Sequence, residues 1–66
     1  MPPSSFTPEL KEILRKADCR FDRHGKGDHD IWFSPINQRK FTVDGKIKSR
    51  HTANAVLKQA GLKKQF

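Results

Sequence analysis

Two stretches of helical periodicity, one near each end of the chain, most constrain the fold of this 66-residue protein. In both stretches apolar residues recur at i, i+3, i+4 and i+7, a spacing that predicts a helix with one apolar face. The positions are Leu10, Ile13, Leu14 and Ala17 in the first stretch, and Ala53, Val56, Leu57 and Ala60 in the second. Each apolar face must be buried against another element.

The ends of both predicted helices carry recognisable signals. Thr7 is expected to be the N-cap of the first helix, with Pro8 at the first helical position, where a missing N–H is tolerated. Ser49 is expected to cap the second helix. Gly61 ends that helix, and Leu62 then packs back against it in a Schellman-type ending.

Between the helices the period changes from 3.6 to 2, which predicts three short strands. The first is expected from Cys19 to His24, the second around Ile31-Trp32-Phe33 and the third from Arg39 to Val43, with turns at 25–28, 34–38 and 44–45. In the first strand, alternation places Cys19, Phe21 and Arg23 on one face and Arg20, Asp22 and His24 on the other.

The element order therefore predicts an α+β fold of helix, three antiparallel strands and helix. Both helices are expected on one face of the small sheet, because one apolar surface then covers both stripes and the other sheet face stays open. This is the layout of a double-stranded-RNA-binding domain (dsRBD). We expect a flexible lead-in at residues 1–6, one domain over 7–62 and a mobile basic tail at 63–66.

Composition limits the function classes. Cys19 is the only cysteine, which excludes an intramolecular disulfide and a cysteine zinc cluster and favours a reducing compartment. No stretch approaches the roughly 18 apolar residues of a membrane span, and residues 1–5 do not resemble a secretory signal. We expect a cytoplasmic protein with no membrane partner. The net charge of +7 indicates a polyanion partner, with an acidic protein as the alternative.

A glycine-paired basic loop precedes the second strand. Gly25 and Gly27 flank Lys26, and glycines let a backbone approach a bulky anion closely. His29 follows, and histidine can lend or take a proton near neutral pH. Such a loop suits a phosphodiester substrate.

The order of these features resembles that of the HicA (YcfA-like) toxin family. The resemblance covers roughly residues 8–62 and includes Gly25-Lys26-Gly27-Asp28-His29, the aliphatic-aromatic pair after it, Pro35, and the capped helix that ends at Gly61-Leu62. It implies a dsRBD-like fold, metal-independent cleavage of mRNA, no cofactor, and capture by a HicB-type antitoxin. The family's catalytic histidine lies in a Gly-Ser-His motif, whose histidine matches His29; Asp28 replaces the serine.

RNA can be cleaved without a metal when its own 2′-hydroxyl attacks the adjacent phosphate. His29 is the candidate general acid or base, and Lys26 with neighbouring N–H groups is the candidate phosphate ligand. Arg23, Arg39 and Lys40 are expected nearby. Lys46, Lys48 and Arg50, at the start of the last helix, are expected to bind phosphate or to be solvated.

Other residues of this region admit two interpretations. His24 flanks the same site or is only exposed, and Asp28 and Asp30 serve the turn or modulate His29. Trp32 is a stacking platform for a base or a buried aromatic. His51 is expected to be exposed, and the histidine spacing builds no metal site.

Three functions from different classes remain open. The first is an mRNA-cleaving toxin that uses His29. The alternative is a non-catalytic RNA-binding module with the same basic surface. A basic partner protein without a nucleic-acid role is the third.

Overall fold

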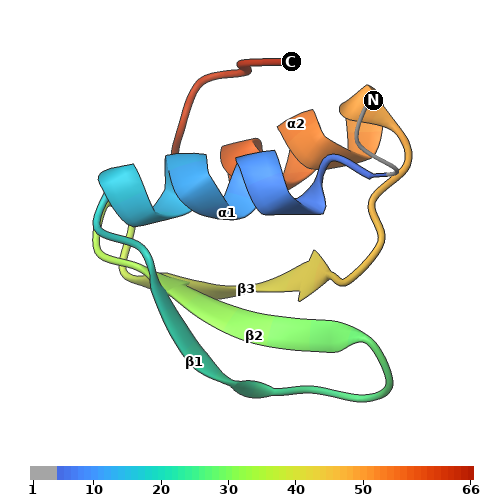
Figure 1. Cartoon of the computed structure of the whole chain (residues 1–66). Coiled ribbons are helices and arrows are strands. Elements are labelled where there is room, and N and C mark those ends of the chain that lie inside the picture. Colours follow the sequence, from blue (N-terminus) through green and yellow to red (C-terminus); the bar gives the residue numbers. More distant parts are fainter. Residues whose placement is uncertain (1–4) are drawn as a thin grey trace.

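The computed structural model describes residues 5–66 and has the element order α1, β1, β2, β3, α2. The strands form one antiparallel sheet in the order β1-β2-β3, and both helices lie on the same side of it (Figure 1). The predicted α+β fold with two helices on one face is thus confirmed. The elements are α1 (Thr7–Lys16), β1 (Arg20–His24), β2 (His29–Ser34), β3 (Arg39–Asp44) and α2 (Arg50–Gln59).

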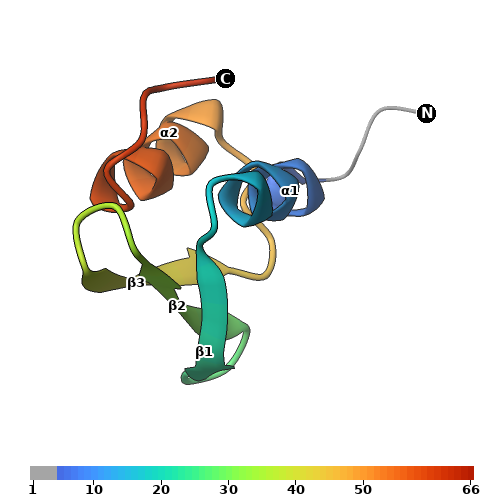
Figure 2. The same cartoon turned by 90° about the vertical axis from the view of Figure 1, so that its left-hand side faces the viewer.

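The core fills the space between the helices and one face of the sheet. Trp32 from β2 and its neighbours on β3 meet the apolar stripes of both helices there, and Figure 2 shows α1 and α2 side by side above the sheet. The buried core residues are Leu10, Leu14, Cys19, Trp32, Phe41, Val43, Ile47, Ala53, Val56, Leu57 and Ala60. The predicted stripes therefore supply much of the core.

The second helix ends as its sequence predicts. The Ser49 hydroxyl accepts a hydrogen bond from the His51 N–H at 3.1 Å, which is the expected N-cap. Gly61 has a φ of 83°, its N–H bonds the Lys58 carbonyl, and the Leu62 N–H bonds the Leu57 carbonyl at 2.8 Å. These two bonds form the Schellman motif.

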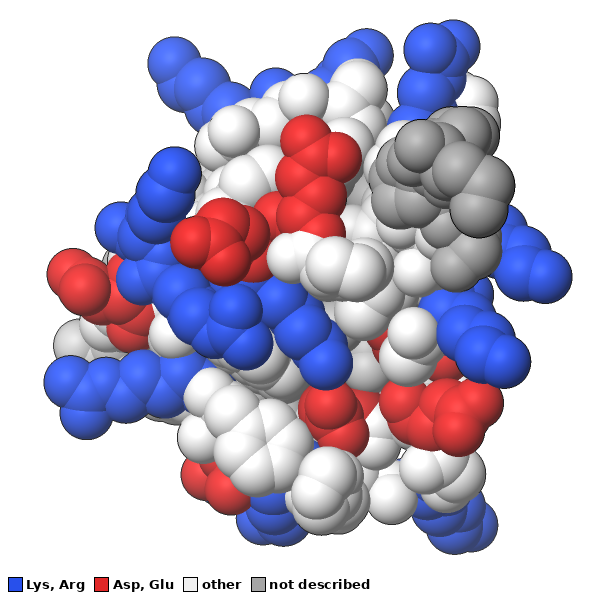
Figure 3. Space-filling model, viewed as in Figure 1, with Lys and Arg blue, Asp and Glu red and all other residues white. Residues whose placement is uncertain are grey.

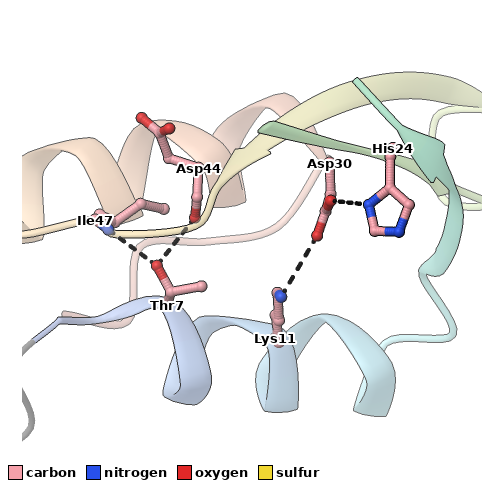
Figure 4. A network of polar contacts seen from close by, with 6 residues as sticks. All are labelled: Thr7, Lys11, His24, Asp30, Asp44 and Ile47. Atoms are coloured by element: carbon pink, nitrogen blue, oxygen red, sulfur yellow. Dashed lines mark hydrogen bonds and ion pairs between the residues drawn. The ribbon is translucent and has the colours of Figure 1, made fainter. Parts of the chain in front are cut away.

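The N-cap predicted for α1 is wrong. Phe6 occupies the cap position, and Thr7 lies in the first turn with its side chain buried. The Thr7 hydroxyl donates to the Asp44 carbonyl at 3.0 Å and accepts from the Ile47 N–H at 2.9 Å. Thr7 therefore ties the start of α1 to the segment between β3 and α2 (Figure 4).

Side-chain hydrogen bonds also hold the C-terminal end of α2. The buried Ser34 hydroxyl, at the end of β2, donates to the Ala60 carbonyl at 2.6 Å and accepts from the Ile36 N–H. Asn37, in the turn that follows, donates to the Gln59 carbonyl at 2.8 Å. Both bonds satisfy carbonyls that the last turn of a helix leaves without an intrahelical partner.

The alternation predicted for the first strand breaks at a β-bulge between Phe21 and Arg23. Asp22 is the extra residue, so Phe21 pairs with Trp32, Arg23 with Ile31 and His24 with Asp30. Because paired residues share a sheet face, His24 lies on the helix side and Arg23 on the open side. The prediction that Arg23 and Phe21 lie on the same face of the sheet is therefore wrong.

The chain ends outside the predicted domain contact each other. Phe6 packs edge-on against Phe66 with ring centroids 5.4 Å apart, and the Phe6 N–H bonds the Ile47 carbonyl. Asn54 bonds the backbone of Gln65 and Phe66. The predicted lead-in and mobile tail thus include residues with specific contacts, while residues 1–4 of the lead-in lie outside the described part of the chain.

Replacing Thr7 with valine keeps the shape of the side chain and removes its hydroxyl. We expect the Thr7→Val substitution to lower the free energy of unfolding by about 1–3 kcal/mol, since it leaves the buried Ile47 N–H unpaired and removes one bond from the partly buried Asp44 carbonyl. Urea unfolding followed by circular dichroism measures this loss. Thr42→Val, the same change at an exposed position, is the matched control. Equal unfolding midpoints for the two variants would show that the hydrogen bonds of the Thr7 hydroxyl do not stabilise the fold.

Candidate functional site

His29 is the first residue of β2, and its side chain lies on the open face of the sheet. Asp30, the next residue, points to the helices, so alternation turns His29 the other way. Asp44 is its pairing partner on β3, with the His29 Nδ1 atom 3.4 Å from Asp44 Oδ1. Half of the His29 side chain is exposed. The imidazole is thus reachable and has a carboxylate beside it.

The glycine-paired loop holds the backbone of His29 on both sides. The Gly25 N–H donates to the His29 carbonyl at 2.7 Å, and the His29 N–H donates to the Lys26 carbonyl at 3.0 Å. Gly27 has a φ of 58°, in the left-handed region that glycine adopts without strain. The turn uses the Gly25 N–H internally, so this N–H, one of the two that flank Lys26, is not available to a phosphate.

The loop also packs tightly on the segment that follows β3. A Cβ atom on Gly45 would lie 3.0 Å from the Asp28 carbonyl oxygen and 3.1 Å from the Asp28 Cβ. Only glycine fits at this contact without displacing the loop. The contact brings the loop next to the segment that carries Lys46 and Lys48, both of which belong to the predicted phosphate-binding set.

Asp44 is the residue of this site that the sequence analysis missed, having treated it only as part of a turn. The turn at 35–38 pairs Ser34 with Arg39, and counting along both strands from that pair places Asp44 opposite His29. The strand register was therefore the signal that locates a carboxylate beside the histidine. The Thr7 hydroxyl, which bonds the Asp44 carbonyl, helps to hold the end of β3 in place.

His24 and Asp30 form a separate network on the helix side of the sheet (Figure 4). The His24 Nδ1 atom lies 2.9 Å from Asp30 Oδ1, and the Lys11 ammonium from α1 lies 3.5 Å from Asp30 Oδ2. The hydrogen bond from His24 holds the pKa of the Asp30 carboxyl below its usual value; partial burial opposes this shift, and the Lys11 charge supports it. His24 thus flanks the hairpin on the face opposite His29.

Trp32 belongs to the core, which excludes its interpretation as a stacking platform. Only 3% of the residue is exposed, and the Phe21 ring packs against it edge-on at 6.4 Å. The Arg15 guanidinium lies 5.9 Å from the ring centroid, close enough for a cation–π contact. An RNA base has no access to the face of this indole.

The remaining predicted cations are exposed and come from several elements. Arg23 lies on the open face and pairs with Asp22 at 3.5 Å, as does Lys40 from β3. Lys26 lies in the exposed loop before His29, while Lys46 and Lys48 lie in the segment before α2. Over residues 5–66 the structure contains no group of three His, Cys, Asp or Glu residues that would hold a metal ion.

A hollow of about 300 Å³ lies at the edge of the sheet, where β3 approaches α2, and His29 is among the residues that line it. His29, Thr42 and Asp44 line it from the sheet, and Thr52, Ala55, Val56 and Gln59 line it from α2, with Ile47 between them. His29 thus lies on the open face of the sheet and also borders this hollow. Among the described residues, no helix is long and apolar enough to span a membrane.

Comparison with known proteins supports one family. The model of a family described as the HicA toxin of bacterial toxin–antitoxin systems matches residues 7–62, which is most of the chain. No curated protein and no solved structure matched the sequence.

The Asp30 network predicts a pH-dependent contribution to stability. Because the pKa of Asp30 is lowered in the folded state, its carboxylate stabilises the fold above the unfolded-state pKa, and this contribution is lost as the pH falls through the folded-state pKa. We expect Asp30→Asn to unfold at a lower urea concentration than wild type at about pH 7, and the difference to shrink as the pH falls below about 3.8, the ordinary pKa of an aspartate. Asp28→Asn, the same change on a loop residue without an ion pair in the described structure, is the control. An equal effect of both substitutions at about pH 7 would show that the Asp30 network does not stabilise the fold.

Proposed function

The chain belongs to the HicA toxin family of bacterial toxin–antitoxin systems, and from this premise we propose that it is an endoribonuclease that cleaves mRNA with His29 as a general acid or base. We further propose that it acts in the cytoplasm, without a metal ion, and that a HicB-type antitoxin inhibits it. The family assignment itself implies an antitoxin partner.

The placement of His29 is the observation that carries this proposal. A general acid or base must be held in position and must reach the proton that it transfers. The backbone bonds to Gly25 and Lys26 hold His29, its imidazole is half exposed on the open face of the sheet, and the residue borders the hollow where β3 approaches α2. His24 lies on the other sheet face and His51 near the start of α2, so His29 is the histidine that meets both requirements.

The proposed reaction uses a nucleophile that the RNA itself supplies. A base takes the proton of a ribose 2′-hydroxyl, the 2′-oxygen attacks the adjacent phosphorus, and the bond from phosphorus to the 5′-oxygen breaks as an acid protonates that oxygen. The products are a 2′,3′-cyclic phosphate and a free 5′-hydroxyl. His29 supplies one of the two proton transfers.

The Asp44 carboxylate gives His29 a partner of opposite charge when the ring is protonated. The atoms that face each other, Nδ1 and Oδ1, lie 3.4 Å apart, so the other ring nitrogen stays free for the substrate. In this role Asp44 is a positioning residue, since it acts through the imidazole. Lys26 from the neighbouring loop is the proposed partner of the phosphate oxygens, whose charge grows in the transition state.

The His29→Ala substitution should abolish toxicity. Loss of a general acid or base lowers catalysis by about 10²–10⁴-fold, so we expect cells that express wild type to stop growing and lose intact mRNA, and cells that express His29→Ala to do neither. His51→Ala, which removes an exposed histidine from α2, is the matched control and should remain toxic. Protein levels are matched by immunoblot.

The same three proteins, once purified, test the reaction directly. Wild type and His51→Ala should cleave single-stranded RNA in the presence of EDTA and leave a cyclic phosphate, and His29→Ala should not. Equal cleavage by all three variants would remove His29 from the mechanism. RNA that binds to wild type but remains intact would favour the non-catalytic RNA-binding module.

A further inference from the structure

The cavity beside His29 continues into a larger hollow along the same edge of the sheet. Strand β3 is an edge strand, and α2 lies beside it (Figure 2). A second hollow, of about 690 Å³, lies between the start of β3 and the end of α2, and both hollows include Ala55 and Gln59 in their walls. We call the two together the β3–α2 groove. Its larger end is lined by Asn37, Arg39, Lys40, Ala55, Lys58 and Gln59.

The larger end of the β3–α2 groove is basic. Three cations line it and no carboxylate does. Lys40 shares the Asp22 carboxylate at 3.5 Å, whereas neither Arg39 nor Lys58 forms an ion pair within residues 5–66. Two cations without a carboxylate partner at the wall of a hollow attract an anionic group strongly.

The face that carries α1 is different. Figure 3 shows acidic side chains among the basic ones over this face, so the positive charge is interrupted there. On α1, Lys11 and Arg15 each pair with a carboxylate. The unpaired cations of the β3–α2 groove thus form a better track for a polyanion than the α1 face does.

The two ends of the groove are too far apart to hold the same phosphate. Arg39 and Asp44 are the first and last residues of β3, and five steps of about 3.4 Å separate them by about 17 Å. Asp44 marks the end at which His29 lies. An extended chain with repeated negative charges is the ligand that can occupy both ends at once.

We propose that the β3–α2 groove binds the backbone of single-stranded RNA. Arg39 and Lys58 hold one phosphate of this backbone, and another phosphate, at the far end of the groove, reacts at His29. This inference rests on the proposed function and extends it to substrate binding. The unpaired edge of β3 adds main-chain N–H groups along the groove. RNA is favoured over an acidic peptide because His29 lines the other end of the groove. A single strand is favoured because proteins recognise an RNA duplex from across its broad, shallow minor groove.

The test compares two double substitutions that remove the same charge. Arg39→Gln/Lys58→Gln removes the two cations without a carboxylate partner from the basic end of the groove and leaves Lys40. Lys63→Gln/Lys64→Gln changes two exposed lysines of the tail. The probe is a single-stranded RNA oligonucleotide with a 2′-O-methyl group on every ribose, which lacks the attacking hydroxyl. Fluorescence anisotropy gives its affinity over a range of salt concentrations.

We expect the groove substitutions to weaken binding about tenfold near about 0.15 M salt. They should also lower the magnitude of the slope of log K against log salt by about 0.7, the value for one lost phosphate contact on a single strand. With cleavable RNA the loss should fall mainly on KM rather than kcat. The tail substitutions should change neither quantity appreciably. Thermal unfolding confirms that each variant is folded, and if the double variant is not, the single substitutions replace it.

Three results would overturn the groove assignment. Equal weakening by groove and tail substitutions would mean that only net charge matters. Unchanged RNA binding with lost antitoxin binding would assign the groove to a protein partner. Tighter binding of a duplex with the same 2′-O-methyl groups than of the single strand would exclude the proposed ligand. If wild type never cleaves RNA but the groove substitutions still weaken binding, the proposed activity fails while the groove remains an RNA site.

Discussion

The antiparallel pairing of β2 with both of its neighbours determines what each face of the sheet presents. Side chains alternate along this strand, so Asp30, Trp32 and Ser34 face the helices while His29, Ile31 and Phe33 face outward. A shift of one residue would exchange the two sets and place Trp32 in solvent and the imidazole in the core. Burial of the indole and presentation of His29 are therefore consequences of one register.

Hydrogen bonds of buried hydroxyl groups add to the limited stability that a small core provides. A chain below about 70–80 residues rarely gains more than about 3–5 kcal/mol from its core, so each helix must be held with few apolar contacts. Here two buried hydroxyls, those of Thr7 and Ser34, each donate one hydrogen bond and accept another. The first links α1 to the strand that carries Asp44, and the second links α2 to the strand that carries His29. The same ties that stabilise the fold thus set the walls around the candidate site.

The sequence predicts those parts of this protein that depend on local patterns. The stripes of both helices, the Ser49 cap and the Schellman ending at Gly61 follow from spacing and residue type alone. The bulge at Asp22 does not follow from a local pattern, because no glycine or proline marks it. The bulge places His24 on the same sheet face as Phe21, where simple alternation had placed it on the opposite face. Thr7 resembles an N-cap in every local respect, and only the distant β3–α2 segment gives its hydroxyl other partners. Pairing across the sheet likewise revealed Asp44, which depends on a register between strands and not on a motif.

The Thr7 tie also bears on the order of events during synthesis. Its partners lie 37 and 40 residues further along the chain. At a translation rate of about 5–20 residues per second, Ile47 is made about 2–8 seconds after Thr7. The first helix is therefore synthesised seconds before the groups that anchor it, and the carboxylate beside His29 is made in the same late segment. A nascent chain that has not yet reached Asp44 and Ile47 lacks both the anchor of α1 and the carboxylate partner of His29.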